Sequence, residues 1–378
     1  MKPSGEGILF LCDYQAPYGG NFIASMMKLD AVLKADGIRT FYLFPKGAEN
    51  RFWMKTMLER GISVEFLPDG GFLVRLQMLL KRIRKDSIRI LHAHFGLFML
   101  AESAAILCPS VNLVLHFHSD FSAGKQPDFN TWIHSILKKI PELLIGKKRL
   151  AKITVSENSA KTEKDCISVR NALVPEREAP EYRSGKEIRL EYSIPEDAKL
   201  LLVFGWSPFI KGVDIAAEAV SSLRNSSGKD FRLGIVFGRT CREEQMRKFI
   251  QDHTALTGEE EWIIMLPPNE DVFRYHDAAD VMLSPSRSET FSYALLEAVY
   301  SGKPVAASDI PGQQWAKQFK TVYFFPFESI EGLETAILRA SDAEEEDLKL
   351  SREIVKKEYG IRTWIDGICE VYRKFLIL

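Results

Sequence analysis

The chain has 378 residues, of which 46% are hydrophobic and 27% charged, and its formal net charge is −1. This length and composition predict a globular protein of two domains and exclude a disordered, fibrous or collagen-like chain. No run of 18 consecutive apolar residues occurs, so the sequence predicts no transmembrane helix.

The near-neutral total conceals an uneven distribution of charge. Residues 1–184 carry 26 Lys and Arg against 19 Asp and Glu, a charge of +7, and the rest of the chain carries −8. The basic half indicates either an anionic partner or a chance distribution of surface charge. Five scattered cysteines without metal-ligand spacing and an N-terminus without a signal peptide predict reduced thiols and a cytoplasmic protein. No nucleic-acid-binding motif is present, so no nucleic-acid partner is expected.

In the first half of the chain, apolar runs of strand length alternate with amphipathic stretches of helix length. The predicted strands are Gly7–Cys12, Thr40–Phe44, Ser63–Phe66, Ile88–His92, Asn112–His116 and Lys152–Val155. The predicted helices are Phe22–Asp36, Arg51–Glu59, Phe72–Lys85, Gly96–Leu107 and Asp128–Leu144. This order is typical of a parallel sheet covered by helices.

Prolines, a glycine and charged residues then fill Val174–Glu187, which reads as a linker. A second alternating series follows. Its predicted strands are Leu200–Phe204, Arg232–Phe237, Trp262–Leu266, Val281–Ser284 and Pro304–Ala307. Its predicted helices are Val213–Leu223, Glu243–Asp252, Asn269–His276, Tyr293–Ser301, Ile330–Ser341 and Asp347–Tyr359, before a final segment Ile361–Leu378. The sequence therefore predicts an α/β protein with two doubly wound domains in tandem.

Ligands of such sheets bind beyond the carboxyl ends of the strands. The strongest candidate is the segment after the strand that ends at Ser284, where polar residues turn the chain and a helix begins near Ser292. The N–H groups and the positive dipole of a helix start suit a phosphate. Glu289 lies in the turn, and Glu297 lies inside the helix, where ribose hydroxyls would give it polar partners. The alternative is an ordinary turn carboxylate and a solvated helix residue.

These residues resemble the E-x7-E region of the family 4 retaining glycosyltransferases, because Glu289 and Glu297 are followed by Ala298, Gly302 and Lys303-Pro304-Val305. The resemblance implies the GT-B fold, in which two Rossmann-like doubly wound domains face a central cleft and a C-terminal helix returns to the N-terminal domain. The expected parts are an acceptor-binding domain at 1–180, a nucleotide-sugar-binding domain at 181–360 and the returning helix at 361–378.

The resemblance also implies the roles of these residues. Glu289 would contact hydroxyls of the donor sugar, and Glu297 would bind the ribose. The backbone amides of Thr290, Phe291 and Ser292 would hold the diphosphate.

A second match to the family lies after the strand that ends at Phe204, where an Arg and a Lys normally clamp the diphosphate. Lys211 is present, but Trp206 occupies the place of the Arg, and Arg239 and Arg287 are candidate substitutes. The donor-binding residues implied here are Gly205, Trp206, Lys211, Gly238, Arg239 and Leu266.

A third match follows the first strand, where the family has a Gly-Gly loop that lets the backbone approach the donor phosphate and the acceptor. Gly19 and Gly20 occupy this loop and would bind the donor, and Asn21 would bind the acceptor. A glycine pair is also an ordinary turn former.

Four of the seven histidines form two H-x-H pairs, His92 with His94 and His116 with His118. Residues i and i+2 of a strand share a face, so each pair could line the cleft, serve the core, or bind a metal. The resemblance places His118 near the transferred sugar as a catalytic residue, together with Glu289 and Lys211. It places His94 and Asp120 in the acceptor pocket and implies no metal and no cofactor beyond the nucleotide sugar.

The resemblance therefore implies a retaining transferase that moves a sugar from a nucleoside diphosphate sugar to a hydroxyl acceptor. The donor is expected to be a UDP-sugar and the acceptor a carbohydrate, a lipid-linked or another hydroxyl compound, in cell-surface polysaccharide or glycoconjugate synthesis. Basic amphipathic helices in the first domain offer peripheral contact with the inner face of a membrane, or they are ordinary solvated helix faces. Two alternatives remain. One is a catalytically silent or partner-activating sugar-nucleotide-binding protein, which Trp206 favours, and the other is a GT-B UDP-sugar 2-epimerase.

Overall fold

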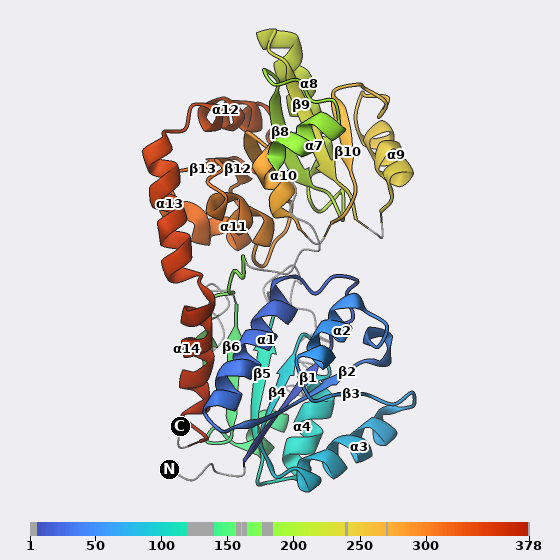
Figure 1. The fold of residues 1–378 in the computed structure, drawn as a ribbon, viewed down its shortest axis with the longest axis vertical. Helices are drawn as coiled ribbons and strands as arrows, with labels where there is room; N and C mark the ends of the chain where they lie inside the picture. Colours follow the sequence, from blue (N-terminus) through green and yellow to red (C-terminus); the bar gives the residue numbers. More distant parts are fainter. Residues whose placement is uncertain are drawn as a thin grey trace. The chain divides into compact units, whose positions relative to one another are not determined.

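The computed structural model of the chain describes residues 6–118, 140–155, 160, 165–175, 184–238, 241–269 and 271–376. The chain divides into two compact units, the first made of Met1–Val174 with Ile361–Leu378 and the second of Pro175–Gly360 (Figure 1). Within the described ranges, no helix is both long enough and apolar enough to cross a membrane.

The first unit is built on a seven-stranded parallel sheet in the order β3-β2-β1-β4-β5-β6-β7. Its strands are β1 Gly7–Cys12, β2 Arg39–Phe44, β3 Val64–Phe66, β4 Ile88–His94, β5 Asn112–Phe117, β6 Leu150–Thr154 and β7 Cys166–Ser168. Helices cover both faces, as a buried parallel sheet requires. These elements are α1 Gly20–Ala35, the 3-10 turn η1 Lys46–Ala48, α2 Phe52–Glu59, α3 Phe72–Lys85, α4 Phe98–Leu107 and α14 Ile361–Tyr372.

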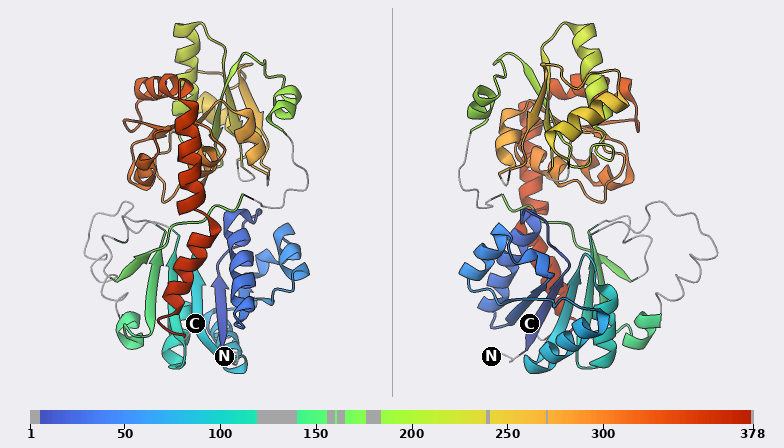
Figure 2. Two further views of the ribbon diagram at one scale, coloured as in Figure 1. Left: turned by 60° about the vertical axis from the view of Figure 1, so that its left-hand side comes forward. Right: turned by 90° about the vertical axis from the view of Figure 1, so that its right-hand side faces the viewer.

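Alternation along the strands divides the first unit into two core layers. In β1, Ile8 and Phe10 face the layer that α1, α2 and α14 complete, whereas Leu9 and Leu11 face α3 and α4. The last helix, α14, buries Trp364 and other apolar side chains in the first of these layers. The predicted return of the C-terminal helix to the first domain is confirmed, and Figure 2 shows α14 lying along the strands of this unit.

The second unit holds a six-stranded parallel sheet in the order β10-β9-β8-β11-β12-β13. Its strands are β8 Lys199–Phe204, β9 Phe231–Val236, β10 Ile263–Leu266, β11 Val281–Ser284, β12 Val305–Ser308 and β13 Val322–Phe325. Its helices are α7 Gly185–Glu191, α8 Val213–Ser227, α9 Glu243–His253, α10 Phe273–Ala278, α11 Tyr293–Tyr300, the 3-10 segment η2 Pro311–Gln318, α12 Ile330–Ser341 and α13 Glu345–Glu358. The predicted α/β class with two doubly wound sheets is confirmed.

The structure differs from the sequence-based elements most clearly in the linker, in one helix and in two short edge strands. The predicted linker ends earlier, because Ser184 and Glu187 form a capping box that starts α7 at Gly185. The helix predicted over Asn269–His276 begins only at Phe273. The short edge strands β7 and β13 were not predicted, because three or four residues give too short a pattern to read. Most of the helix predicted over Asp128–Leu144 lies outside the described residues.

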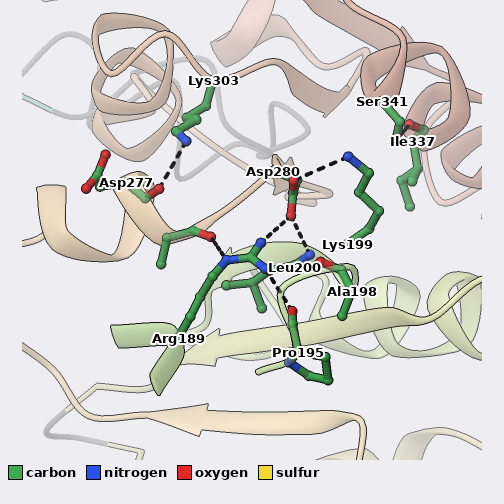
Figure 3. Close-up of polar contacts among 11 residues, drawn as sticks. Arg189, Pro195, Ala198, Lys199, Leu200, Asp277, Asp280, Lys303, Ile337 and Ser341 are labelled. Atoms are coloured by element: carbon green, nitrogen blue, oxygen red, sulfur yellow. Dashed lines mark hydrogen bonds and ion pairs between the residues drawn. The ribbon is translucent and has the colours of Figure 1, made fainter. Parts of the chain in front are cut away.

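Arg189 of α7 organises the amino ends of β8 and β11 (Figure 3). Its guanidinium donates to the carbonyl oxygens of Pro195, Ala198 and Ala278 at 3.1, 3.2 and 2.9 Å, and to Asp280 Oδ2 at 2.5 Å. Asp280 Oδ2 also accepts from the backbone N–H of Leu200 at 2.8 Å. This cluster lies at the opposite edge of the sheet from the carboxyl ends of the strands, so its role is structural.

Replacing Arg189 by Met is expected to lower the free energy of unfolding of the second unit by about 2–3 kcal/mol. The change leaves Asp280 without its main cation and three carbonyls without their donor. Chemical denaturation followed by circular dichroism measures the loss. Lys199→Ala is the matched control, because Lys199 is 47% exposed and meets the same Asp280 at 3.4 Å. Its expected cost is below about 0.5 kcal/mol, and equal losses in the two variants would refute the special role of Arg189.

Candidate functional site

The candidate site lies where the strand order of the second sheet reverses. β8 has β9 on one side and β11 on the other, so the loops after β8 and β11 leave the sheet side by side. The backbone N–H of Arg287 donates to Ile210 O at 2.7 Å and joins the two loops. Gly212 closes the contact with φ +65°, and a Cβ at this position would lie 2.0 Å from Pro285 O. Only glycine fits there.

This contact brings together two residues that the sequence predicted for the donor site. Lys211 from the first loop forms an ion pair with Glu289 from the second, and the side chains are only 12% and 10% exposed. Ser286 Oγ donates to the same carboxylate oxygen of Glu289 at 2.9 Å. A carboxylate and an ammonium are thus held side by side at the carboxyl edge of the sheet.

A third loop, which sequence reasoning missed, supports Glu289 from the other side. Gly312 in η2 lies so close to the backbone of Glu289 that a Cβ on Gly312 would be 1.8 Å from Glu289 O. Trp315 donates from Nε1 to Gly312 O at 3.0 Å and stacks on Phe291, with ring centroids 4.5 Å apart. The Pro311-Gly312 dipeptide after β12 was the available signal, because Pro-Gly marks a turn.

The helix that follows this loop begins where the sequence predicted. Ser292 is the N-cap of α11, and its Oγ accepts from the N–H of Leu295 at 3.4 Å. Within the described part of the chain, the backbone amides of Phe291 and Ser292 have no hydrogen-bond acceptor. These N–H groups lie at the positive end of the helix dipole, which is the arrangement that binds an anion.

Glu297 is buried in α11, with its side chain 7% exposed, so it is not the solvated helix residue of the alternative interpretation. His276 of α10 is fully buried, and its Nε2 lies 3.9 Å from Glu297 Oε2. A buried carboxylate needs polar partners. The contact of Glu297 with a ribose stays a prediction.

Trp206 stands after β8, where the resemblance leads one to expect an arginine, and its indole ring is exposed. Trp206 is 55% exposed, and the ammonium of Lys211 lies 5.4 Å from the centroid of its indole. Arg287 does not fill the gap. Its guanidinium pairs with both oxygens of Asp214 at 2.8 and 2.7 Å and with Glu328 at 2.5 Å. These carboxylates raise the pKa of Arg287. Arg239, the other suggested substitute, lies outside the described residues.

The remaining predicted donor residues follow β8, β9 and β10. Gly205 donates its N–H to Val236 O at 2.8 Å. Gly238 packs on Trp206, and a Cβ on Gly238 would lie 2.9 Å from Trp206 Cβ. The side chain of Leu266 is fully buried, and its carbonyl accepts from Phe237 N at 3.1 Å. None of these three residues offers a polar side chain to a ligand.

The predicted residues of the first unit follow β1, β4 and β5. The Gly-Gly pair starts α1: Gly19 is its N-cap and accepts from Tyr14 Oη at 3.2 Å, and Gly20 has φ +54°. Asn21 is buried, and its Oδ1 accepts from Val174 N at 3.0 Å. The contact of Asn21 with an acceptor stays a prediction. The contact that the structure shows for its side chain is the one with Val174 of the same unit.

His94 is fully buried, and its Nδ1 lies 3.1 Å from Nε2 of the half-buried His118 at the end of β5. Desolvation lowers the pKa of His118 to about 3, so this imidazole is neutral at pH 7. Asp120 lies outside the described residues. The catalytic role of His118 and the acceptor roles of His94 and Asp120 stay predictions.

The second unit matches a family of known proteins. Residues 185–357, nearly all of the second unit, match the model of the glycosyl transferases group 1 family. The D-inositol 3-phosphate glycosyltransferase of Nocardia farcinica is 29% identical over 155 residues, which are 40% of this chain and 34% of that protein. The chain thus aligns with about a third of that relative's length.

Solved structures share the fold over the whole chain. A glycosyltransferase from Rickettsia africae superposes with a TM-score of 0.79 at 15% identity and covers 98% of both chains. The complex of HepE from Anabaena with UDP gives a TM-score of 0.73 at 15% identity and covers 97% of this chain and 99% of that one.

Two doubly wound parallel sheets and a helix that returns to the first define a GT-B protein. The match to the glycosyl transferases group 1 model lies within the second unit.

Proposed function

We propose that the chain transfers a sugar from a nucleoside diphosphate sugar to a hydroxyl acceptor with retention of anomeric configuration. The observation that carries the proposal is the junction of Lys211 and Glu289 beside the start of α11. A cation, a carboxylate and helix-start amides converge there, and these are the groups that a sugar diphosphate needs.

Each group matches one part of the donor. The amides of Phe291 and Ser292 would accept the diphosphate oxygens, and Lys211 would neutralise the charge that grows on the leaving diphosphate. Glu289 would accept hydrogen bonds from sugar hydroxyls. The ion pair between Lys211 and Glu289 keeps both side chains in place until the donor arrives. Donor binding would then redirect the ammonium toward phosphate.

The buried Glu297 would bind the ribose, five residues into α11 from the phosphate-binding N-cap Ser292. The UDP complex of the structural relative HepE makes UDP the first nucleotide to test. In this proposal, Lys211 and the backbone amides stabilise the leaving nucleoside diphosphate, and no divalent cation is needed beside it. A lipid-linked or carbohydrate acceptor, a role in cell-surface glycoconjugates, a cytoplasmic location and peripheral membrane contact stay predictions.

A panel of nucleoside diphosphates in a thermal-shift assay, followed by donor turnover, tests the proposal. A nucleotide that binds the native state raises the stability by RT ln(1 + [L]/Kd), about 2.7 kcal/mol at 100 times Kd. We expect one base to shift the melting temperature. The matching sugar nucleotide should release its nucleoside diphosphate only when an acceptor is present. No shift with any base would defeat the proposal. Donor conversion without an acceptor would identify a 2-epimerase instead.

The exposed Trp206 in place of an arginine supports a second candidate, a sugar-nucleotide-binding protein without turnover. Binding with no product from any acceptor would favour it.

Trp206→Arg is expected to tighten the Kd of the cognate nucleoside diphosphate about tenfold, equivalent to about 1.4 kcal/mol. The new guanidinium would add a second fixed cation beside Lys211 and form charge-assisted hydrogen bonds to the diphosphate. Isothermal titration calorimetry measures the change. Trp206→Gln removes the ring without adding charge and is the control. A Kd that tightens equally in both variants would show that ring removal, and not the cation, is responsible.

A further inference from the structure

Four histidine side chains of the first unit lie on one face of its sheet. The proposed function does not need all four of them. His92 and His94 are two residues apart on β4, so they share a face, and His94 pairs in register with His116 of β5. His118 continues the row beyond β5. This face is the one covered by α1 and α14, two helices that lie close together in the first unit (Figure 2).

Three of the rings form a compact triangle. Their centroids lie 4.1 Å apart for His92 and His94, 4.9 Å for His94 and His116, and 5.4 Å for His92 and His116. One nitrogen from each ring lies within 4.8 Å of the other two. In a tetrahedral site with Zn–N bonds of about 2.0–2.1 Å, ligand nitrogens are about 3.3 Å apart and ring centroids about 5 Å apart. The ring centroids lie near this spacing, but the rings are stacked, with interplanar angles of 29° for His92 and His94 and 8° for His92 and His116, so metal binding would have to turn the rings toward a common point.

Within the part of the chain that the structure describes, the hydrogen bonds of the three rings leave several of their nitrogens without a partner. His92 Nδ1 meets Tyr372 Oη of α14 at 2.6 Å, and His94 Nδ1 meets His118 Nε2 at 3.1 Å. Among the described residues, the opposite Nε2 atoms of His92 and His94 and both ring nitrogens of His116 have no partner. All three side chains are 0% exposed. Polar atoms buried at this depth without a hydrogen-bond partner are costly, so the arrangement needs a physical reason.

We propose that His92, His94 and His116 form a binding site for a divalent transition metal of the Zn²⁺ class. Imidazole nitrogen is a preferred ligand of Zn²⁺, Co²⁺ and Ni²⁺. The outer bonds to Tyr372 and His118 are the contacts that orient ligating histidines through their second nitrogen. Among the described residues no carboxylate joins the three ligands, so water or hydroxide would complete the coordination.

The consequence concerns the first unit. Tyr372 belongs to the last helix and forms a hydrogen bond with His92, one of the proposed ligands. A bound metal would therefore stabilise the packing of α14 on β4 and β5. The inference is independent of the donor site, because its three ligands belong to the first unit and Lys211 and Glu289 belong to the second.

Full-length protein without an affinity tag, stripped with a chelator and dialysed, would be titrated with Co²⁺ and then with Zn²⁺. We expect one equivalent of Co²⁺ to give the visible d–d absorption of a tetrahedral nitrogen site, and Zn²⁺ to displace it. His116→Gln should weaken Co²⁺ binding more than about 100-fold, and Tyr372→Phe about 10–100-fold. His253→Gln is the matched control, because His253 is exposed on α9, and it should leave the affinity unchanged.

Absence of the tetrahedral spectrum, or Co²⁺ binding that His116→Gln leaves intact, would overturn the proposal. Thermal melting of each metal-free variant checks its fold. If His116→Gln does not fold, Tyr372→Phe decides, since it removes one hydroxyl and keeps the core aromatic. Unchanged Co²⁺ affinity in that folded variant would then refute the site.

Discussion

Replacing Glu289 by Gln is expected to lower the turnover of donor about 10²–10³-fold while the protein stays folded. The amide keeps the shape of the side chain but loses the charge that holds Lys211 and receives the sugar hydroxyls. Loss of one preorganised electrostatic contact in an active site costs about 3–4 kcal/mol of transition-state stabilisation. Release of nucleoside diphosphate under saturating donor and acceptor gives kcat, and circular dichroism confirms the fold.

Glu328→Gln is the matched control, because Glu328 is a carboxylate of the same unit that pairs with Arg287 and is 46% exposed. It should change kcat less than about twofold. Lys211→Met adds a second test. If Lys211 and Glu289 act as one unit, the double variant should be little worse than the poorer single variant. Full activity of Glu289→Gln would remove this residue from the site.

Gly312→Ala is expected to lower the free energy of unfolding of the second unit by about 2–3 kcal/mol and its melting temperature by roughly 5–10 °C. The new methyl group would lie 1.8 Å from Glu289 O, a distance that only movement of one of the two loops can relieve. Because Glu289 is the residue displaced, donor turnover should fall at least about tenfold at temperatures where the variant is folded. Differential scanning calorimetry and the same turnover assay measure the two effects.

Gly71→Ala is the control for the glycine substitution. A Cβ at Gly71 has no atom within 4 Å, and its φ is −71°. This variant should match the original protein in stability and turnover. A Gly312→Ala protein that melts normally but has lost activity would show that the loop moves without cost, and the steric argument for stability would then fail.

The two donor loops illustrate what the sequence predicts well. Strand-like runs followed by Lys211 and by Glu289 imply two loops at one edge of a parallel sheet, because all strands of such a sheet end at that edge. The start of α11 at Ser292 was likewise predicted, since a serine before an apolar helix is a frequent N-cap. These predictions need only local pattern and the direction of the strands.

Arg287 shows where such reasoning stops. Next to a predicted phosphate site it resembles a free cation, yet its charge is committed to Asp214 and Glu328, 73 and 41 residues away in sequence. The contact of Gly312 with Glu289 is of the same kind, because it depends on how η2 lies over the loop after β11. The histidine rows could be placed on one face from the sequence, but the burial of His94 depends on the helices that cover that face.

The shared core of the first unit has a consequence for how the chain folds. The layer built on β1 receives Trp364, Ile368 and Tyr372 from the last helix, although more than 180 residues of the second unit separate α14 from the rest of its core. On the ribosome, the second unit has its whole sequence available before the first unit does. The polypeptide synthesised first therefore completes its fold last, and a nascent chain that stops before residue 361 leaves the apolar surface of α1 and β1 uncovered for a chaperone to bind.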